Sequence, residues 1–170
     1  MTIDIQSGPL QPSLLDRLID EDPVSQDSES YQARILTASQ LRAAVLRDLS
    51  HLMNATCMAA SQSLDDWPHV RDSVINFGLP SFSGQTASTL DVADLEEQIR
   101  NAILRFEPRI LEESLEVEAI MDDTVMGWHN VISCRINGHV WGQPLPVELS
   151  VRTEVDLETG QVTLTDIEHF

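Results

Sequence analysis

The spacing of the apolar residues changes near Pro108, and this change limits the folds that the chain can adopt. Upstream of Pro108 the apolar residues recur every three or four positions, which is the period of an amphipathic helix. Downstream they recur at every second position, which is the period of a half-buried strand. Helices therefore precede strands, and the sequence predicts an α+β fold with N-terminal helices packed on a C-terminal antiparallel β-sheet.

The first long helix is expected to begin at Ser39, which can act as its N-cap, and to end near Met58. A short helical turn from Val70 to Phe77 follows in the prediction, and Gly78 ends it. Residues that share the apolar face of the long helix are expected in the core: Leu41, Val45, Leu49, Leu52 and Met53.

The second long helix has the clearest boundaries in the sequence. Asp91 is a good N-cap, and Leu90 and Leu95 have the spacing of a hydrophobic staple around it. Pro108 disfavours the helical conformation at the residue before it, so the helix should end there. The expected buried stripe consists of Val92, Leu95, Ile99, Ala102, Ile103 and Phe106.

Segments with alternating apolar and polar residues predict the sheet. They are residues 115–119, residues 147–155 and a last strand that contains Val162 and Leu164 after a turn at Gly160.

Asn137-Gly138, between two alternating runs, has the pattern of a two-residue hairpin turn. Such a turn would pair Ile136 with His139 and Cys134 with Trp141. It would also place on one face of the hairpin the residues Ile132, Cys134, Ile136 and Trp141.

The charge of the chain makes some partners improbable. Twenty-eight acidic residues face ten basic residues, all of them arginine, so the net charge is -18. Such a surface repels phosphate backbones and anionic lipid head groups, so we expect no nucleic-acid binding and no membrane-surface role. The sequence has no run of eighteen apolar residues and no secretory h-region, so we also expect no direct membrane insertion and no signal peptide. A protein partner with basic residues fits better.

Residues 1–30 are expected to form an acidic N-terminal arm, and residues 31–170 a single domain. The arm holds seven acids against Arg17 alone, and it is rich in Ser, Gln and Pro. One short helix is expected within it, opened by Pro12-Ser13. Its apolar stripe, formed by Leu14, Leu15, Leu18 and Ile19, either docks on a partner or packs on its own domain.

Few residues suggest metal or cofactor chemistry. Cys57 and Cys134 form no CxxC pair and are expected to be free thiols. His129, Cys134 and His139 are evenly spaced, but the expected hairpin places Cys134 and His139 on one face and His129 on the other. We therefore expect no metal site, and without a glycine-rich phosphate loop we expect no cofactor.

A pair of carboxylates that cleaves glycosidic bonds stays open as an alternative. Such a pair needs two acids about 5 to 9 Å apart, and among twenty-eight acids some pair meets this distance by chance. The alternative function is a peptidoglycan-cleaving, lysozyme-like hydrolase. It predicts that the chain clears a peptidoglycan suspension and that one acid-to-amide change abolishes the clearance.

Glu107-Pro108-Arg109 ends the second long helix with two opposite charges around a proline. Pro108 fixes its own φ near -65°, so the two charged side chains leave a stiff corner. Arg109 offers a planar fork of donors that suits a carboxylate or carbonyl groups on a partner. An internal ion pair between Glu107 and Arg109, which fixes the corner, is the other interpretation.

Several segments in this order resemble the TssE family, the baseplate subunits of type VI secretion systems, which are related to lysozyme-like wedge proteins of contractile-tail phages. The resemblance rests on residues 15–18, 41–49, 52–56, 73–80, 106–110 and 149–160, which read LDRL, LRAAVLRDL, LMNAT, SVINFGLP, FEPRI and LSVRTEVDLETG.

The resemblance implies a non-catalytic structural protein of the baseplate. It would connect the wedge core, made of TssF and TssG and neighboured by TssK, to the contractile sheath of TssB and TssC. It would also start sheath polymerisation, with its sheet offering an edge for strand addition. The family's Glu-Pro-Arg corner contacts the wedge core, which assigns partner binding to Glu107, Pro108 and Arg109. The implied location is cytoplasmic, in a baseplate docked at the inner membrane.

Overall fold

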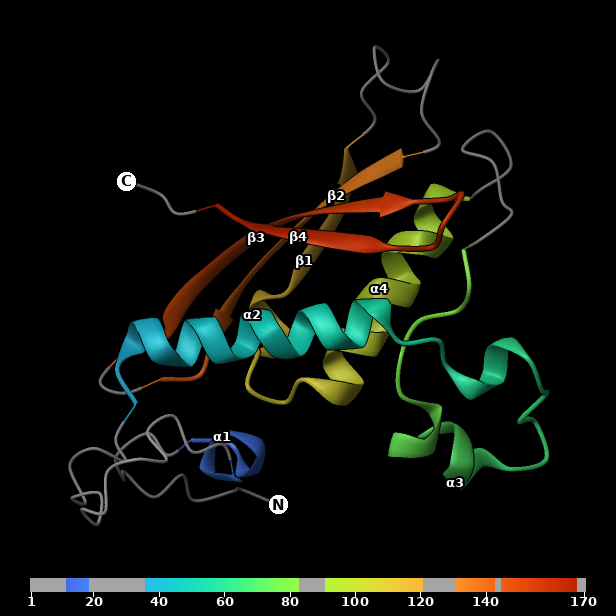
Figure 1. Ribbon diagram of the computed structural model, residues 1–170, viewed down its shortest axis with the longest axis horizontal. Helices are drawn as coiled ribbons and strands as arrows, with labels where there is room; N and C mark the ends of the chain where they lie inside the picture. Colours follow the sequence, from blue (N-terminus) through green and yellow to red (C-terminus); the bar gives the residue numbers. More distant parts are fainter. Residues whose placement is uncertain (1–11, 19–35, 83–90, 121–130, 143–144, 168–170) are drawn as a thin grey trace.

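The computed structural model describes residues 12–18, 36–82, 91–120, 131–142 and 145–167. In this part of the chain the helices come first, and one antiparallel sheet follows, in which four strands lie side by side in the order of the sequence. Figure 1 shows α2 (Ala38–Asn54) running alongside the sheet and α3 (Pro68–Arg71) lying on the other side of α2 from the sheet. The predicted α+β arrangement is confirmed. Of the predicted arm, only residues 12–18, which include α1 (Leu14–Leu18), are described.

Helix α2 (Ala38–Asn54) begins one residue before Ser39, the predicted cap, and ends before Met58. Thr37, rather than Ser39, is the N-cap, because Thr37 and Gln40 form a capping box in which each side chain accepts from the other residue's backbone N–H. The Gln40 N–H donates to Thr37 Oγ1 at 3.2 Å, and the Thr37 N–H donates to Gln40 Oε1 at 2.9 Å. The predicted buried face is confirmed, with Leu41, Val45, Leu49, Leu52 and Met53 all in the core.

Helix α4 (Val92–Phe106) has the predicted boundaries. Asp91 is the N-cap, and its carboxylate accepts from the N–H groups of Ala93 and Asp94. Leu95, Ile99, Ala102 and Ile103 are buried. Leu90, the other half of the predicted staple, lies outside the described residues.

The chain between α2 and α4 forms short helices rather than one turn. These are η2 (Met58–Ala60), α3 (Pro68–Arg71) and η3 (Val74–Asn76). Gly78 follows at φ 119°, and a parallel bridge joins Thr56 to Leu79. The predicted turn from Val70 to Phe77 is thus divided between α3 and η3.

The sheet consists of β1 (Glu116–Ile120), β2 (Val131–Val140), β3 (Val147–Asp156) and β4 (Val162–Asp166). The strands predicted at residues 147–155 and after Gly160 are confirmed, and Gly160 has the positive φ of a turn, 74°. The sheet and the two long helices share one hydrophobic cluster. Each fully buried aliphatic side chain in it contributes roughly 1.5–3 kcal/mol. The sheet residues of this cluster include Ile132, Cys134, Ile136, Val140, Leu149, Val151 and Val155.

The predicted hairpin at Asn137-Gly138 is wrong, because β2 runs straight through both residues. Asn137 pairs with Glu116 on one side and with Ser150 on the other, and Gly138 pairs with Leu149. As a result Val140 lies on the buried face, whereas Trp141, predicted there, follows the strand and is only partly buried.

The glycine at position 138 permits a close approach of the chain rather than a turn. A Cβ atom there would lie 3.4 Å from Ile110 Cγ2 and 3.8 Å from the Cα of Leu115. The segment between these two residues includes η4 (Glu112–Ser114), which passes over β2 at this point. Because glycine serves turns and close approaches equally well, the sequence signal was ambiguous.

The described residues contain no helix that combines the length and the apolar character needed to cross a bilayer.

Two glycine substitutions distinguish strain from simple contact. Gly78→Ala should lower the free energy of unfolding by about 2 kcal/mol or more, because its φ is positive and its Cβ would lie 2.3 Å from the Ala55 oxygen. Gly138→Ala should change it by less than about 1 kcal/mol, because its neighbours allow a methyl group. Urea unfolding measures both. A large loss at Gly138 would contradict a continuous β2.

Candidate functional site

The Glu-Pro-Arg corner lies where α4 gives way to the sheet. Glu107 is the C-cap of α4, and its N–H donates to the Ile103 oxygen at 2.8 Å. Its side chain is only 4% exposed. Pro108 is exposed, and the Arg109 side chain is 23% exposed. The corner therefore turns one charged group inward and leaves the other two residues at the surface.

Glu107 and Arg109 form an internal ion pair. Arg109 Nε donates to Glu107 Oε1 at 2.7 Å, and Arg109 Nη2 donates to Glu107 Oε2 at 2.5 Å. The backbone N–H of Arg109 donates to the same carboxylate at 3.1 Å. This bidentate contact compensates the buried charge of Glu107, and it raises the pKa of Arg109 above its ordinary value, through the hydrogen bond to Glu107 first.

The corner is also joined to β2 by its backbone. The Arg109 oxygen accepts from the Trp141 N–H at 2.7 Å, and the Leu111 N–H donates to the His139 oxygen at 2.8 Å. Ile110 forms an antiparallel bridge with Val140. The corner thus extends the pairing with β2 upstream of the first residue of β1, and it is attached to the end of β2.

A chain of alternating charges leads from the corner to the N-terminal helix. Arg109 Nη2 also donates to Asp48 on α2 at 2.5 Å, and Arg47 binds the other oxygen of Asp48 at 2.7 Å. Arg47 Nη1 then donates to Asp16 of α1 at 2.5 Å. Burial would raise the pKa of Asp16, but hydrogen bonds from Ser13 and Arg47 outweigh it and lower that pKa.

Helix α1 combines features of both predicted roles. Asp16 holds it against α2, as packing on its own domain requires. Leu14 and Leu18 are nevertheless exposed. Ile19 and the Leu15 side chain, which completed the predicted stripe, lie outside what the structure describes.

The corner has donors left for a partner. Arg109 uses Nε and Nη2 inward, and its Nη1 has no hydrogen-bond partner among the described residues. Pro108 lies beside it as a rigid apolar surface. Glu107 is too deeply buried to meet a partner, so its part in any contact is to hold Arg109 in place.

The β4 edge of the sheet is partly covered by α2. Backbone hydrogen bonds join Asp156 to Gln161 and Ser150 to Ile167, and in an antiparallel pair every second residue pair is bonded in this way. Leu164 belongs to one of the other pairs, so its backbone N–H and C=O point away from β3. The same holds for Val162 and Asp166. The Asn54 amide at the end of α2 pairs with the N–H of Val162 at 3.0 Å and with its oxygen at 2.9 Å. The outward groups of Leu164 and Asp166 have no partner in the described part of the chain.

The β1 edge is covered in a similar way by α4. Glu96 Oε1 accepts from the outward N–H of Ala119 at 2.7 Å. Val117 lies two residues before Ala119, so its backbone N–H and C=O also point away from β2, and neither has a hydrogen-bond partner among the described residues. Each edge thus has one helix side chain that stands in for a neighbouring strand.

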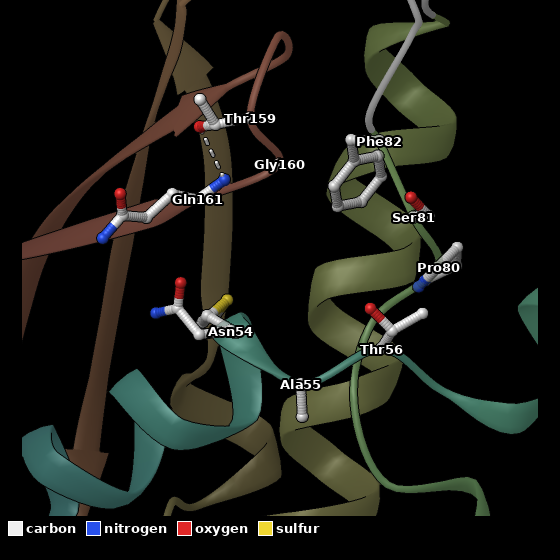
Figure 2. Close-up of a pocket in the computed structure, with 10 residues that line it drawn as sticks. Asn54, Ala55, Thr56, Pro80, Ser81, Phe82, Thr159, Gly160 and Gln161 are labelled. Atoms are coloured by element: carbon white, nitrogen blue, oxygen red, sulfur yellow. Dashed lines mark hydrogen bonds between the residues drawn. The ribbon is translucent and has the colours of Figure 1, made fainter.

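A surface cleft of about 290 Å³ lies between the end of α2, residues 80–82 and the turn at residues 159–161. Figure 2 shows the Phe82 ring on one side and the polar side chains of Asn54 and Gln161 on the other. None of its lining residues is titratable. The cleft therefore lacks an acid, a base or a nucleophile with a perturbed pKa.

The corner brings a pair of carboxylates together, but an arginine lies between them. Glu107 and Asp48 both bind Nη2 of Arg109, so a guanidinium occupies the space between them. A glycosidase needs that space for a sugar and a water. The arrangement suits a structural ion pair better than bond cleavage.

The cysteines and histidines are not gathered into a site. Cys57 and Cys134 are free thiols and are buried, and burial raises the pKa of Cys134 to about 11. Cys134 and His139 lie on opposite faces of the continuous β2, which corrects the prediction that they share one. His129 lies outside the described residues. Among those described, no group of three or more His, Cys, Asp or Glu side chains could hold a metal ion.

Sequence reasoning found the corner but missed the residues that complete it. Asp48 lies 61 positions from Arg109, and no local pattern connects them. The sequence feature that could have indicated Asp48 is its position beside the buried stripe of α2, next to Leu49. Asn54 and Glu96 were missed for the same reason, because each acts on a distant strand.

The two partners of the corner should differ in their importance for stability. Arg109→Ala leaves the Glu107 carboxylate buried without its cation, and should lower the free energy of unfolding by about 3 kcal/mol. Glu107→Ala leaves Arg109 partly solvated and bound to Asp48, and should cost about 1–2 kcal/mol. The double variant should cost less than the sum. Urea unfolding tests this, and additive losses would contradict a coupled pair.

The attachment of α1 should depend on pH. The pKa of Asp16 is lowered, so its contribution is present above about pH 4 and is lost as the pH falls through its folded-state pKa. Asp16→Asn should speed amide exchange in α1 about threefold at pH 7. Below that folded-state pKa, where the native carboxyl is also protonated, the difference should vanish. The α4 amides serve as the internal control, and an equal effect at both pH values would contradict the ion pair.

The comparisons with known proteins fit this geometry. A family model described as "Baseplate wedge protein gp25" matches residues 39–145, which is more than half of the chain and includes nearly all of α2 as well as α4, the corner, β1 and β2. Neither the curated proteins nor the solved structures give a match. By the family model, the chain belongs to the baseplate wedge protein gp25 family.

Proposed function

We propose that the chain is a structural baseplate component of a type VI secretion system that connects the wedge core to the contractile sheath and initiates sheath polymerisation. Family membership supports a structural role in a phage-type baseplate. The more specific function follows from the resemblance to the TssE family. The observation that carries it is the corner, which is fixed from within and still offers Arg109 Nη1 and Pro108 at the surface.

The wedge core of TssF and TssG, with TssK beside it, is the proposed partner of the corner. Three contacts already fix the Arg109 side chain, so little rotamer entropy is lost when its last donors bind a carboxylate or carbonyl groups. The proposed place of the assembly is the cytoplasmic face of the inner membrane, where a baseplate docks.

The sheath of TssB and TssC is the proposed partner of the β4 edge. Leu164 and Asp166 offer outward backbone groups there, whereas β1 offers both groups only at Val117. An added strand would continue the antiparallel order of the sheet. Asn54 marks where that addition ends, because its amide already occupies Val162.

The hydrolase alternative has weaker support. The corner carboxylates are closed by Arg109, and the cleft in Figure 2 has no titratable lining. We therefore propose a non-enzymatic role. Clearance of peptidoglycan by micromolar protein, abolished by a single acid-to-amide change, would overturn this part of the proposal.

Wedge-core binding tests the corner without removing its internal charge. Arg109→Lys keeps a cation for Glu107 but loses the fork, and should raise the Kd for the TssF–TssG complex about tenfold. Arg152→Lys, on the outer face of the sheet, is the matched control and should bind as the native chain does. Thermal unfolding verifies the fold of both. Native-like binding by Arg109→Lys would mean that the corner stabilises the fold and does not contact the wedge core. Failure of the native chain to bind would overturn the wedge contact.

Matched prolines test the choice of edge. Leu164→Pro and Val117→Pro each remove an outward N–H without breaking a ladder bond, and both positions are half-buried. Leu164→Pro should abolish seeding of TssB–TssC polymers by the chain, and Val117→Pro should leave it intact. The reverse result would move the sheath to β1, and seeding by both variants would overturn strand addition at these edges.

A further inference from the structure

The segment of residues 64–76 exposes three large apolar side chains. Trp67 is 61% exposed, Val74 80% and Ile75 63%. The other large hydrophobic residues exposed in the described part of the chain are Leu14, Leu18 and Leu145. A single exposed leucine is ordinary, but three such side chains within nine positions mark a surface that a partner can cover.

Hydrogen bonds within the segment fix the backbone that carries its apolar side chains. Asn76 is buried, its Oδ1 accepts from the Ala59 N–H at 2.9 Å, and its Nδ2 donates to the Arg71 oxygen at 3.0 Å. Ser73 caps η3 by accepting from the Ile75 N–H at 3.3 Å. Below them Leu64 is buried. A surface built in this way loses little backbone entropy when it binds.

The last turn of α4 connects this segment to the corner. Arg105 Nη1 donates to the Arg71 oxygen at 3.2 Å, and Arg105 Nη2 lies 3.1 Å from Asp72. The Phe106 ring meets Phe77 edge to face, with the centroids 5.3 Å apart. Arg105 and Phe106 come directly before Glu107. One helix end therefore positions both surfaces, and Figure 1 shows α3 on the side of α2 away from the sheet.

We propose that residues 64–76 form a second docking surface for the same wedge-core partner that the corner contacts. The inference rests on the proposed function. The partner would offer an apolar pocket for Trp67, because tryptophan is the residue that most often dominates binding energy at an interface. Basic residues would border that pocket, because the exposed Asp65 and Asp66 come directly before Trp67.

A second copy of this chain fits the surface less well. Two copies would bring Asp65 and Asp66 of each together, on chains that each carry a net charge of -18. A basic rim on a different protein removes this repulsion. Self-association is therefore the competing outcome of the experiment rather than a second proposal.

Binding to the TssF–TssG complex tests the surface with exposed variants that spare the fold. Trp67→Ala and the double variant Val74→Ser/Ile75→Ser should each raise the Kd about tenfold or more. Leu145→Ser is the matched control, because Leu145 is 74% exposed but lies just before β3, and its Kd should stay within about twofold of the native value. Thermal unfolding should show native-like midpoints, because these side chains contribute little burial.

The outcomes separate this inference from the proposed function. Weaker binding by both segment variants, with the control unchanged, supports the second surface. Native-like binding by both variants, while Arg109→Lys still weakens it, overturns the second surface and leaves the corner standing. Failure of the native chain to bind overturns both. If the native chain forms concentration-dependent dimers that Trp67→Ala abolishes, the partner of this surface is a second copy of the chain and not the wedge core.

Discussion

The buried carboxylate of Glu107 is the constraint on which the rest of the structure depends. A charge placed at the end of a helix and out of water needs a fixed cation, and Arg109 supplies it two residues later. The same guanidinium reaches Asp48 on α2, and the backbone beside it joins β2. The corner therefore connects α4, α2 and the sheet, which also share one hydrophobic cluster. The internal contacts use Nε and Nη2 of Arg109, so the proposed contact of Nη1 with a partner would not compete with them.

Much of the fold could be predicted because the deciding signals are local. The change of period at Pro108 separates helices from strands, and the Asp91 cap and Pro108 bound α4. Asn137-Gly138 was misread because the reason for that glycine is the passage of Ile110 and Leu115 over β2, more than twenty positions upstream. Local pattern cannot reveal a neighbour that only folding brings close.

The candidate site shows the same limit. Glu107 and Arg109 are near in sequence, so their pairing could be anticipated as one of two interpretations. Asp48, Asn54 and Glu96 each act across 23 to 108 positions, and a polar residue at the margin of a buried stripe gives no sign of its target. The sequence contained the residues of the site, while the tertiary contacts decided which of them belong to it.

Helix α2 carries contacts to four different places in the molecule. Arg42 pairs with Asp166 at the end of β4, Arg47 holds α1, Asp48 completes the corner, and Asn54 covers the start of β4. Each contact requires its residue at one angle around the helix axis. A single inserted or deleted residue between Arg42 and Asn54 would turn everything beyond it by about 100°. We infer that α2 tolerates substitutions at many positions but no change of length. The thirteen residues from Arg42 to Asn54 fix the spacing and the angles between its four contacts.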